Sequence, residues 1–144
     1  MEKEFKESEI EEVAKEILLK IKKEKTVSSA TVVALSGDLG AGKTTMTQAL
    51  AKLLGLSDKI SSPTFILMKN YELKNSAWEK LIHIDAYRIE KSRELLSLGW
   101  KNIISDPHNV VLIEWPERVI DILPEHIKIN FSHTSDEGRE IEIL

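Results

Sequence analysis

Residues 30–44 read Ala-Thr-Val-Val-Ala-Leu-Ser-Gly-Asp-Leu-Gly-Ala-Gly-Lys-Thr, an apolar run that leads into a glycine-rich loop. Within this stretch, residues 37–44 satisfy the pattern GxxxxGK[ST] of a phosphate-binding loop. The context fits, because a strand is predicted over Ala30–Ser36 and an amphipathic helix from Gly42 to Gly55. Since this chemistry requires a strand, a loop and a helix in that order, the stretch predicts a P-loop nucleotide site.

The residue types of this loop indicate how it would hold a phosphate. Its glycines let the backbone approach an anion without a Cβ clash, so that successive N–H groups and the helix N-terminus face the anion. Lys43 offers a positive charge to the β- and γ-phosphates, and Thr44 offers a hydroxyl to Mg²⁺. The alternative is a glycine-rich turn with a surface lysine. The expected nucleotide-binding residues of the loop are Gly37, Asp38, Leu39, Gly40, Ala41, Gly42, Lys43, Thr44 and Thr45.

Two apolar strands end in an acidic residue, which a P-loop site needs for its Mg²⁺. Residues 81–85 read Leu-Ile-His-Ile-Asp, and residues 110–114 read Val-Val-Leu-Ile-Glu. We favour Glu114 as linked to the metal and Asp85 as orienting the attacking water or a Mg²⁺-bound water, with Lys43 as the third catalytic residue. The sequence does not decide which acid contacts the metal, and an acid in this position can also cap a helix or lie in solvent.

A short segment between the loop and the first acid, Ser61–Phe65, reads Ser-Ser-Pro-Thr-Phe. Many P-loop proteins carry a switch here that senses the γ-phosphate. The hydroxyl of Thr64 is suited to contact Mg²⁺ or the γ-phosphate in such a switch. Pro63 is equally compatible with a simple turn into the next strand.

Five further side chains are candidates for the site. Arg88, Arg118 and Arg139 can each face a phosphate or the base, although exposure to solvent is the ordinary state of an arginine. Trp115 can stack on adenine or on a partner, or pack in the core. His83 lies inside a predicted strand and is interpreted as structural.

The alternation of strands and helices predicts an α/β fold. Helices are expected over residues 8–24, with Ser8 and Glu11 as a capping box, and over 91–98. The Lys/Glu run in 2–25 is expected to be the solvated face of the first helix. Further strands are expected near 65–71, 81–85, 110–115, 126–133 and 139–144, the last two as a hairpin. We therefore predict a P-loop NTPase-like three-layer sandwich whose mixed sheet has a parallel core and antiparallel edge strands.

The composition indicates an ordinary globular domain over residues 1–144, with 42% hydrophobic and 31% charged residues. The absence of cysteine fits a reducing cytoplasm, and the N-terminus lacks the apolar core of a signal peptide. No apolar run has the length of a transmembrane helix. The net charge of −4 argues against tight binding of nucleic acid by the chain alone. A cytoplasmic protein without membrane contact is therefore expected.

The chain resembles the TsaE (YjeE) family in motifs that follow one another along nearly its whole length. These motifs are GDLGAGKTT (37–45), SPTF (62–65), HIDAYR (83–88), ELLSLGW (94–100) and IEWPER (113–118). The resemblance implies a Mg²⁺-dependent ATPase subunit of bacterial tRNA threonylcarbamoyladenosine (t6A) biosynthesis. The implied partners are TsaB and TsaD, and TsaD would transfer the threonylcarbamoyl group to adenosine 37 of tRNAs that read codons beginning with A.

The resemblance also implies roles for residues that match the family motifs. Residues 37–44 would bind ATP, with Thr44 and Glu114 on Mg²⁺. Thr64 and Asp85 would lie in the switch region and near the catalytic water. The ATP cycle would reset or remodel the complex between turnovers, and this chain would contact tRNA only indirectly, within the complex.

Three more positions are matched to the family, one of them, Arg118, at the end of the last motif. Arg118 and Arg139 would approach the nucleotide, and Glu9, at the start of the first helix, would lie near the base. Ala86 departs from the family pattern, which has a larger apolar residue there, but it leaves Asp85 and Arg88 in place.

The sequence also bears on the other classes of P-loop protein. Neither an NKxD nor a DxxG motif is present, which argues against a Ras-like GTPase and favours adenine. The chain has four arginines and no long insertion, so it lacks the arginine-rich lid of small nucleotide kinases. With its own site incomplete, it is expected to be a weak ATPase that depends on partners. A nucleotide-gated binding module without turnover and a small-molecule kinase remain as alternatives.

Overall fold

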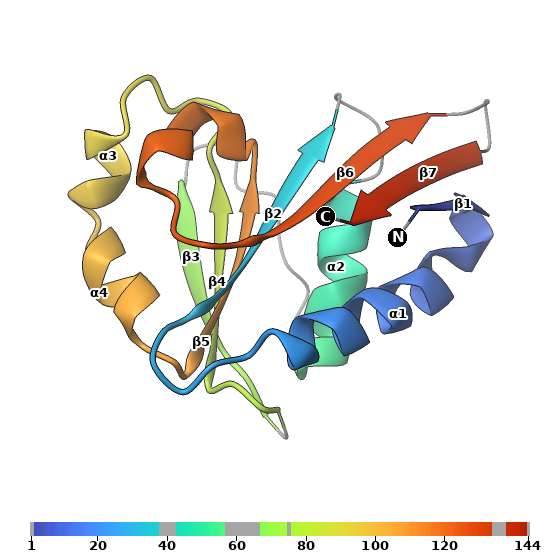
Figure 1. The fold of residues 1–144 in the computed structure, drawn as a ribbon, viewed down its shortest axis with the longest axis horizontal. Helices are drawn as coiled ribbons and strands as arrows, with labels where there is room; N and C mark the ends of the chain where they lie inside the picture. Colours follow the sequence, from blue (N-terminus) through green and yellow to red (C-terminus); the bar gives the residue numbers. More distant parts are fainter. Residues whose placement is uncertain (1, 38–42, 57–66, 75, 134–137, 144) are drawn as a thin grey trace.

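The computed structural model describes residues 2–37, 43–56, 67–74, 76–133 and 138–143 of the chain. Its strands form one seven-stranded sheet, with helices on both faces (Figure 1). The strands are β1 (Glu2–Lys6), β2 (Thr31–Gly37), β3 (Met68–Glu72), β4 (Lys80–Asp85), β5 (Asn109–Glu114), β6 (Ile127–His133) and β7 (Gly138–Ile143). The helices are α1 (Ile10–Lys23), α2 (Lys43–Leu54), α3 (Arg93–Leu96) and α4 (Trp100–Ser105), with 3₁₀ segments η1 (Glu7–Glu9) and η2 (Pro116–Ile122).

The order of strands across the sheet is β1-β7-β6-β2-β5-β4-β3. The inner strands β6, β2, β5 and β4 pair in parallel, whereas β3, β7 and β1 pair antiparallel to their neighbours. The predicted mixed sheet, with a parallel core and antiparallel edge strands, is therefore confirmed. The predicted hairpin is also confirmed, because β6 and β7 are consecutive antiparallel neighbours.

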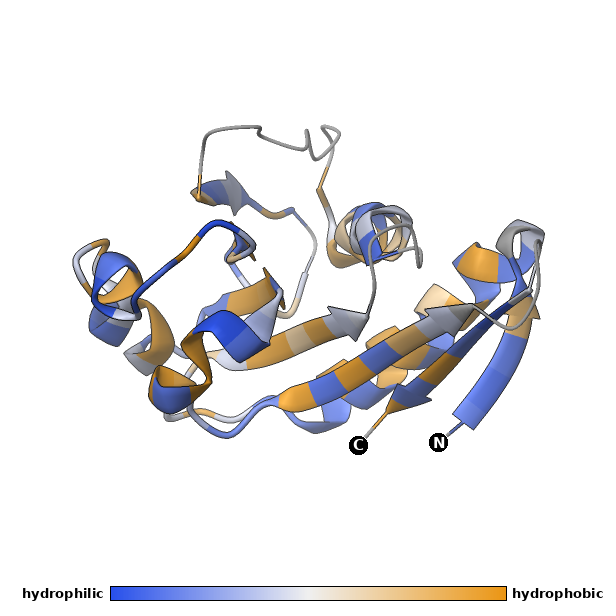
Figure 2. Ribbon diagram, turned by 90° about the horizontal axis from the view of Figure 1, so that it is seen from above, coloured by the Kyte–Doolittle hydropathy of each residue, from blue (hydrophilic) through white to orange (hydrophobic). Residues whose placement is uncertain are grey.

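Each face of the parallel strands is covered by its own set of helices. Because side chains alternate along a strand, Leu35 and Leu112 point into a core with α1 and α2, while Ala34 and Ile113 point into a core with α3, α4 and η2. Coverage on both faces explains why β2 and β5 are continuous apolar runs. Strands β6 and β7 instead alternate between apolar and polar residues, and β1 is mostly hydrophilic (Figure 2). The predicted three-layer arrangement is thus confirmed.

The first 24 residues depart in part from the prediction. Helix α1 is present, with Val13 and Ile17 fully buried as its periodicity predicted. The capping box is wrong, because the 3₁₀ segment η1 precedes the helix and Glu9 is its N-cap, with no side-chain cap hydrogen bond. Residues 2–6, assigned to a solvated helix face, form β1 instead. Pairing with β7 buries Phe5, which outweighs the local preference of the charged residues.

The helical layer on the second face is only partly predicted. The expected helix over 91–98 is confirmed as the shorter α3, but α4 and η2 were not predicted. Both are fixed by long-range contacts: the indole N–H of Trp100 donates to the carbonyl of Ile122 at 3.1 Å, and its ring is 1% exposed. Among the described residues, no helix combines the length and the apolar character needed to cross a bilayer.

Candidate functional site

The carboxyl ends of three parallel strands bring the predicted residues together. Strand β2 ends at Gly37, β4 at Asp85 and β5 at Glu114, and parallel pairing places these ends at one edge of the sheet. Asp85 and Glu114 are direct neighbours across β4 and β5, and Glu114 lies opposite Leu35 of β2. Lys43 begins helix α2, which follows β2 in the chain. Ligands of open α/β sheets bind at such an edge.

Some of the predicted loop and switch residues lie outside the described part of the chain. These residues are Asp38, Leu39, Gly40, Ala41, Gly42 and Thr64. Gly37, the first glycine of the loop, is described. Its φ is +143°, and a Cβ there would lie 2.6 Å from the carbonyl oxygen of Phe131 on β6. Only glycine fits this close approach, so the chain must leave β2 with a glycine.

Lys43 is a buried cation, 5% exposed. Its ammonium donates a hydrogen bond to the carbonyl of Gly37 and lies 3.4 Å from the centre of the Trp115 ring. Such a cation–π contact stabilises a charge that has left water. Burying a lysine is costly unless its charge is compensated. Lys43 therefore contacts groups at the end of β2 and directly after β5.

Trp115 reaches Lys43 because the chain turns sharply after Glu114. Its backbone is left-handed, with φ 58° and ψ 51°, which is uncommon for a bulky residue. The N–H of Trp115 donates to the carbonyl of Leu35 at 3.3 Å, which ties this turn to β2. Strained backbone of this kind persists only where the surroundings enforce it, and it concentrates at functional sites.

Glu114 and His83 form a buried pair. The side chain of Glu114 is 6% exposed, and that of His83 is 4% exposed. His83 Nε2 lies 2.7 Å from Glu114 Oε2, and since a carboxylate only accepts, the imidazole donates. Among the described residues, His83 is the hydrogen-bond partner of the Glu114 side chain. A buried carboxylate without a partner would be strongly destabilising, so the pair is coupled.

Asp85 is half-buried and has a different environment. Its Oδ1 accepts the N–H of Tyr87 at 3.1 Å, which is the geometry of an Asx turn. The N–H of Asp85 donates to Leu67 at 3.0 Å, so the end of β4 is held on both sides. Asp85 therefore holds the turn that follows β4, and it lies at the same edge of the sheet as Glu114.

An aromatic and cationic group lies beside the acids. The rings of Tyr87 and Trp115 are 4.9 Å apart and inclined by 54°, and the guanidinium of Arg118 is 5.9 Å from the Tyr87 ring. Arg118 is exposed, next to this aromatic pair. The structure therefore connects Lys43, through Trp115 and Tyr87, to an arginine at the surface.

Two predicted residues lie at the same edge but on the antiparallel side of the sheet. Arg139, at the start of β7, donates from Nη1 to the carbonyl of Gly138 at 3.1 Å. Glu9 is exposed, and its Oε1 accepts the N–H of Lys6 at 3.0 Å. Lys6 is the partner of Gly138 across β1 and β7, so the end of β1 and the start of β7 lie side by side. In the described part of the chain, the hydrogen bonds of the Arg139 and Glu9 side chains are thus local, and neither reaches Lys43, Asp85 or Glu114.

The donor set suits Mg²⁺ shared with phosphates. Glu114 and Asp85 supply carboxylate oxygens, and Thr44, exposed in the first turn of α2, supplies a hydroxyl. Among the described residues, no group of three or more His, Cys, Asp or Glu side chains forms a metal cage. Mg²⁺ prefers hard oxygen ligands and is ordinarily held by one or two carboxylates together with phosphates and water. The residues present therefore fit this ion.

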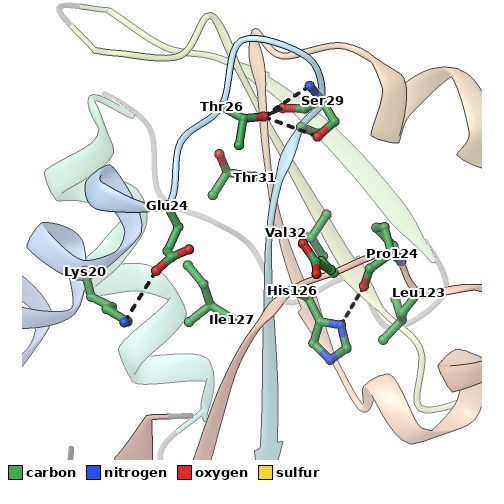
Figure 3. Close-up of a pocket in the computed structure, with 12 residues that line it drawn as sticks. Lys20, Glu24, Thr26, Ser29, Thr31, Val32, Leu123, Pro124, His126 and Ile127 are labelled. Atoms are coloured by element: carbon green, nitrogen blue, oxygen red, sulfur yellow. Dashed lines mark hydrogen bonds and ion pairs between the residues drawn. The ribbon is translucent and has the colours of Figure 1, made fainter.

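A separate cavity of about 710 Å³ opens at the other end of the parallel strands (Figure 3). It lies between α1, the start of β2 and the segment before β6, so it contains none of the predicted site residues. Lys20 of α1 forms an ion pair of 3.4 Å with Glu24, directly after the helix, and His126 Nδ1 donates to the carbonyl of Pro124 at 2.8 Å. The ion pair and the His126 hydrogen bond join residues close together in the chain, whereas the hydroxyl of Thr31, also at this cavity, accepts the indole N–H of Trp78 at 3.3 Å.

The family model and the sequence relatives that match this chain carry the same name, TsaE. Residues 5–141 match the family model described as "Threonylcarbamoyl adenosine biosynthesis protein TsaE". A tRNA threonylcarbamoyladenosine biosynthesis protein TsaE from Haemophilus influenzae is 38% identical over 130 residues, which is 90% of this chain and 77% of that protein. The protein of the same name from a Nostoc species is 38% identical over 122 residues, 82% of this chain and 72% of the relative.

A solved structure extends the likeness to three dimensions. The crystal structure of YdiB from Bacillus subtilis superposes with a TM-score of 0.65 and 28% sequence identity. The match covers 98% of this chain and 83% of that chain. The resemblance inferred from the sequence motifs is therefore confirmed by the family model, by sequence relatives and by fold.

Proposed function

The chain belongs to the TsaE family of tRNA threonylcarbamoyladenosine biosynthesis proteins, and from that premise we propose that it binds and hydrolyses ATP with Mg²⁺ during formation of this modification. The observation that carries the proposal is the convergence of Lys43, Asp85 and Glu114 at the carboxyl edge of the parallel strands. A cation and two acids beside a P-loop sequence are the parts that phosphoryl transfer needs.

Each residue has a distinct role in this proposal. Lys43 binds the β- and γ-phosphates, for which it leaves the Trp115 ring and the Gly37 carbonyl. Glu114 and Thr44 hold Mg²⁺, which when bound neutralises charge on the phosphate oxygens. Asp85 orients the attacking water, because one of its oxygens is fixed by the Tyr87 N–H while the carboxylate stays half-buried at the site. Arg118 and Arg139 are proposed to approach the nucleotide, and Glu9 the base.

Catalysis is proposed to be completed by partner proteins, TsaB and TsaD, which the family resemblance implies. In the described part of the chain, Arg118 is exposed and rests near Tyr87 rather than beside Lys43 or the acids. Phosphoryl transfer often needs an arginine or a loop that a second protein positions. A partner that docks near Tyr87 and Trp115 would act on Lys43 through the contact between Trp115 and the lysine.

The test is ATP turnover by this chain alone, with TsaB and TsaD, and with tRNA added. We expect slow turnover alone and a large increase with partners. A fast rate that partners leave unchanged would contradict partner-completed catalysis and would favour a free-standing hydrolase or kinase.

A nucleotide-gated binding module is the second candidate. The contact between Lys43 and Trp115 favours it, because nucleotide binding alone would break this contact and change the surface around Tyr87. Single-turnover measurements with partners separate the two functions. Complex formation that follows ATP occupancy without hydrolysis would support the module.

A further inference from the structure

We propose that His83 is a positioning residue for Glu114: it fixes one carboxylate oxygen and leaves the other for the Mg²⁺ site. This inference rests on the proposed function, since it concerns how Glu114 holds the metal. From sequence alone, His83 is interpreted as a structural residue, and this inference gives it a role in the metal site. The geometry that carries it is the 2.7 Å contact between Nε2 and Oε2.

The sheet determines that the two side chains meet. His83 pairs with Leu112 across β4 and β5, and Glu114 is two residues further along β5. Since side chains alternate along strands, His83 and Glu114 point to the same face as Leu112, which packs with α2. Diagonal neighbours on one sheet face are within reach of long side chains. The histidine therefore approaches the acid from within the sheet, away from the loop edge.

The burial of the pair limits what else can hold the carboxylate. The two side chains are 4% and 6% exposed, so water has little access to compete for Oε2. Within the described residues, the imidazole of His83 is the group that hydrogen-bonds this carboxylate. A carboxylate anchored at one oxygen keeps a single orientation, and such partners of metal-binding groups commonly change metal affinity about 10- to 100-fold when removed.

Two substitutions at His83 separate positioning from simple packing. His83→Leu keeps a buried side chain of similar size and removes the donor. His83→Gln keeps a side-chain N–H that reaches as far as Nε2. The matched control is Trp78→Phe, which removes another buried side-chain hydrogen bond of this sheet, from the indole to Thr31 at 3.3 Å, at the opposite end of the strands.

The measurement is calorimetric titration of ATP at a series of Mg²⁺ concentrations and in the absence of metal, with thermal unfolding to check the fold. For His83→Leu we expect the half-saturating Mg²⁺ concentration to rise about tenfold or more, with metal-free ATP binding unchanged. His83→Gln should remain within about threefold of the wild type, and Trp78→Phe should match the wild type. The electron paramagnetic resonance spectrum of Mn²⁺ in the complex with ATP should change in His83→Leu and recover in His83→Gln.

Other outcomes of these measurements would contradict the inference. A folded His83→Leu variant with wild-type Mg²⁺ dependence, alongside a Glu114→Gln variant that loses it, would overturn the inference and leave the proposed function intact. If the wild type shows no Mg²⁺-dependent ATP binding, the proposed function and this inference both fail. If His83→Leu does not fold, His83→Asn, whose amide is too short to reach, replaces it; equal Mg²⁺ dependence of the Asn and Gln variants would overturn the inference.

Discussion

The two ends of the parallel strands hold their polar side chains in different ways. At the carboxyl ends, Lys43, His83 and Glu114 are each at most 5% exposed and contact groups on other elements. At the amino ends, around the cavity of Figure 3, Lys20 pairs with Glu24, four residues along the chain, and both are about half-exposed. Burying charge is costly, so a buried cation and acid indicate a site more reliably than an open cavity does.

The largest effect is expected at Asp85. Asp85→Asn should bind ATP nearly normally and hydrolyse it on the order of 10²- to 10⁴-fold more slowly, because it loses the group that orients water. Glu114→Gln should instead weaken the Mg²⁺ dependence of ATP binding. Turnover and calorimetry are measured on both, with Asp106→Asn, an acid just before β5, as the control at the amino end. The opposite pattern would exchange the roles of Asp85 and Glu114. Normal hydrolysis by both variants would show that neither acid is catalytic.

Lys43 tests the same comparison through binding. Lys43→Ala should weaken the affinity for ATP about ten- to hundredfold, since a charge-assisted contact contributes about 1.5–3 kcal/mol. Lys20→Ala, which removes a lysine at the cavity of the amino ends, should leave ATP binding unchanged. Calorimetric titration with ATP and with GTP measures this. No loss in Lys43→Ala, or equal affinity for GTP, would contradict the P-loop ATPase proposal.

Trp115 should report nucleotide binding by its fluorescence. If the ammonium of Lys43 leaves the ring for a phosphate, a contact worth about 0.5–2 kcal/mol is lost and the emission of Trp115 changes. Trp115→Phe should abolish the change, whereas Trp78→Phe, at the amino ends, should retain it. An ATP-induced change that survives in Trp115→Phe would place the response elsewhere.

The smallest effect concerns the pH dependence of stability at the amino end. The backbone N–H of His108, and less strongly its side chain, lower the pKa of Asp106 below its ordinary 3.8. A lowered folded-state pKa stabilises the protein above the ordinary value, and the gain is lost as pH falls through the folded pKa. Asp106→Asn should lower Tm slightly at neutral pH, and its difference from wild type should vanish in acid. Melting curves from pH 7 to 2 measure this, and a difference that persists in acid would contradict it.

Local patterns predicted the parts of the site that depend on local chemistry. The loop motif, the apolar strands and their terminal acids are short-range features, and the parallel core follows from their alternation with helices. The convergence of Asp85 and Glu114 at one edge was predictable for the same reason, because carboxyl ends of parallel strands meet.

Contacts that depend on strand order or register could not be predicted. The pair of His83 and Glu114 requires β4 and β5 to be neighbours in one particular register. Strand β1 forms because the other end of the chain, β7, pairs with it, which residues 2–6 alone do not indicate. The contact of Trp115 with Lys43 depends on a left-handed residue directly after β5.

Reconstitution of tRNA modification tests the central proposal most directly. TsaB, TsaD, tRNA and the substrates of the modification are incubated without this chain, with the wild type and with Lys43→Ala, and threonylcarbamoyladenosine is measured over many turnovers. We predict sustained formation only with the wild type and with hydrolysable ATP. Equal formation in all three reactions would contradict the proposal that the carboxyl edge of this sheet is the ATP site that the modification requires.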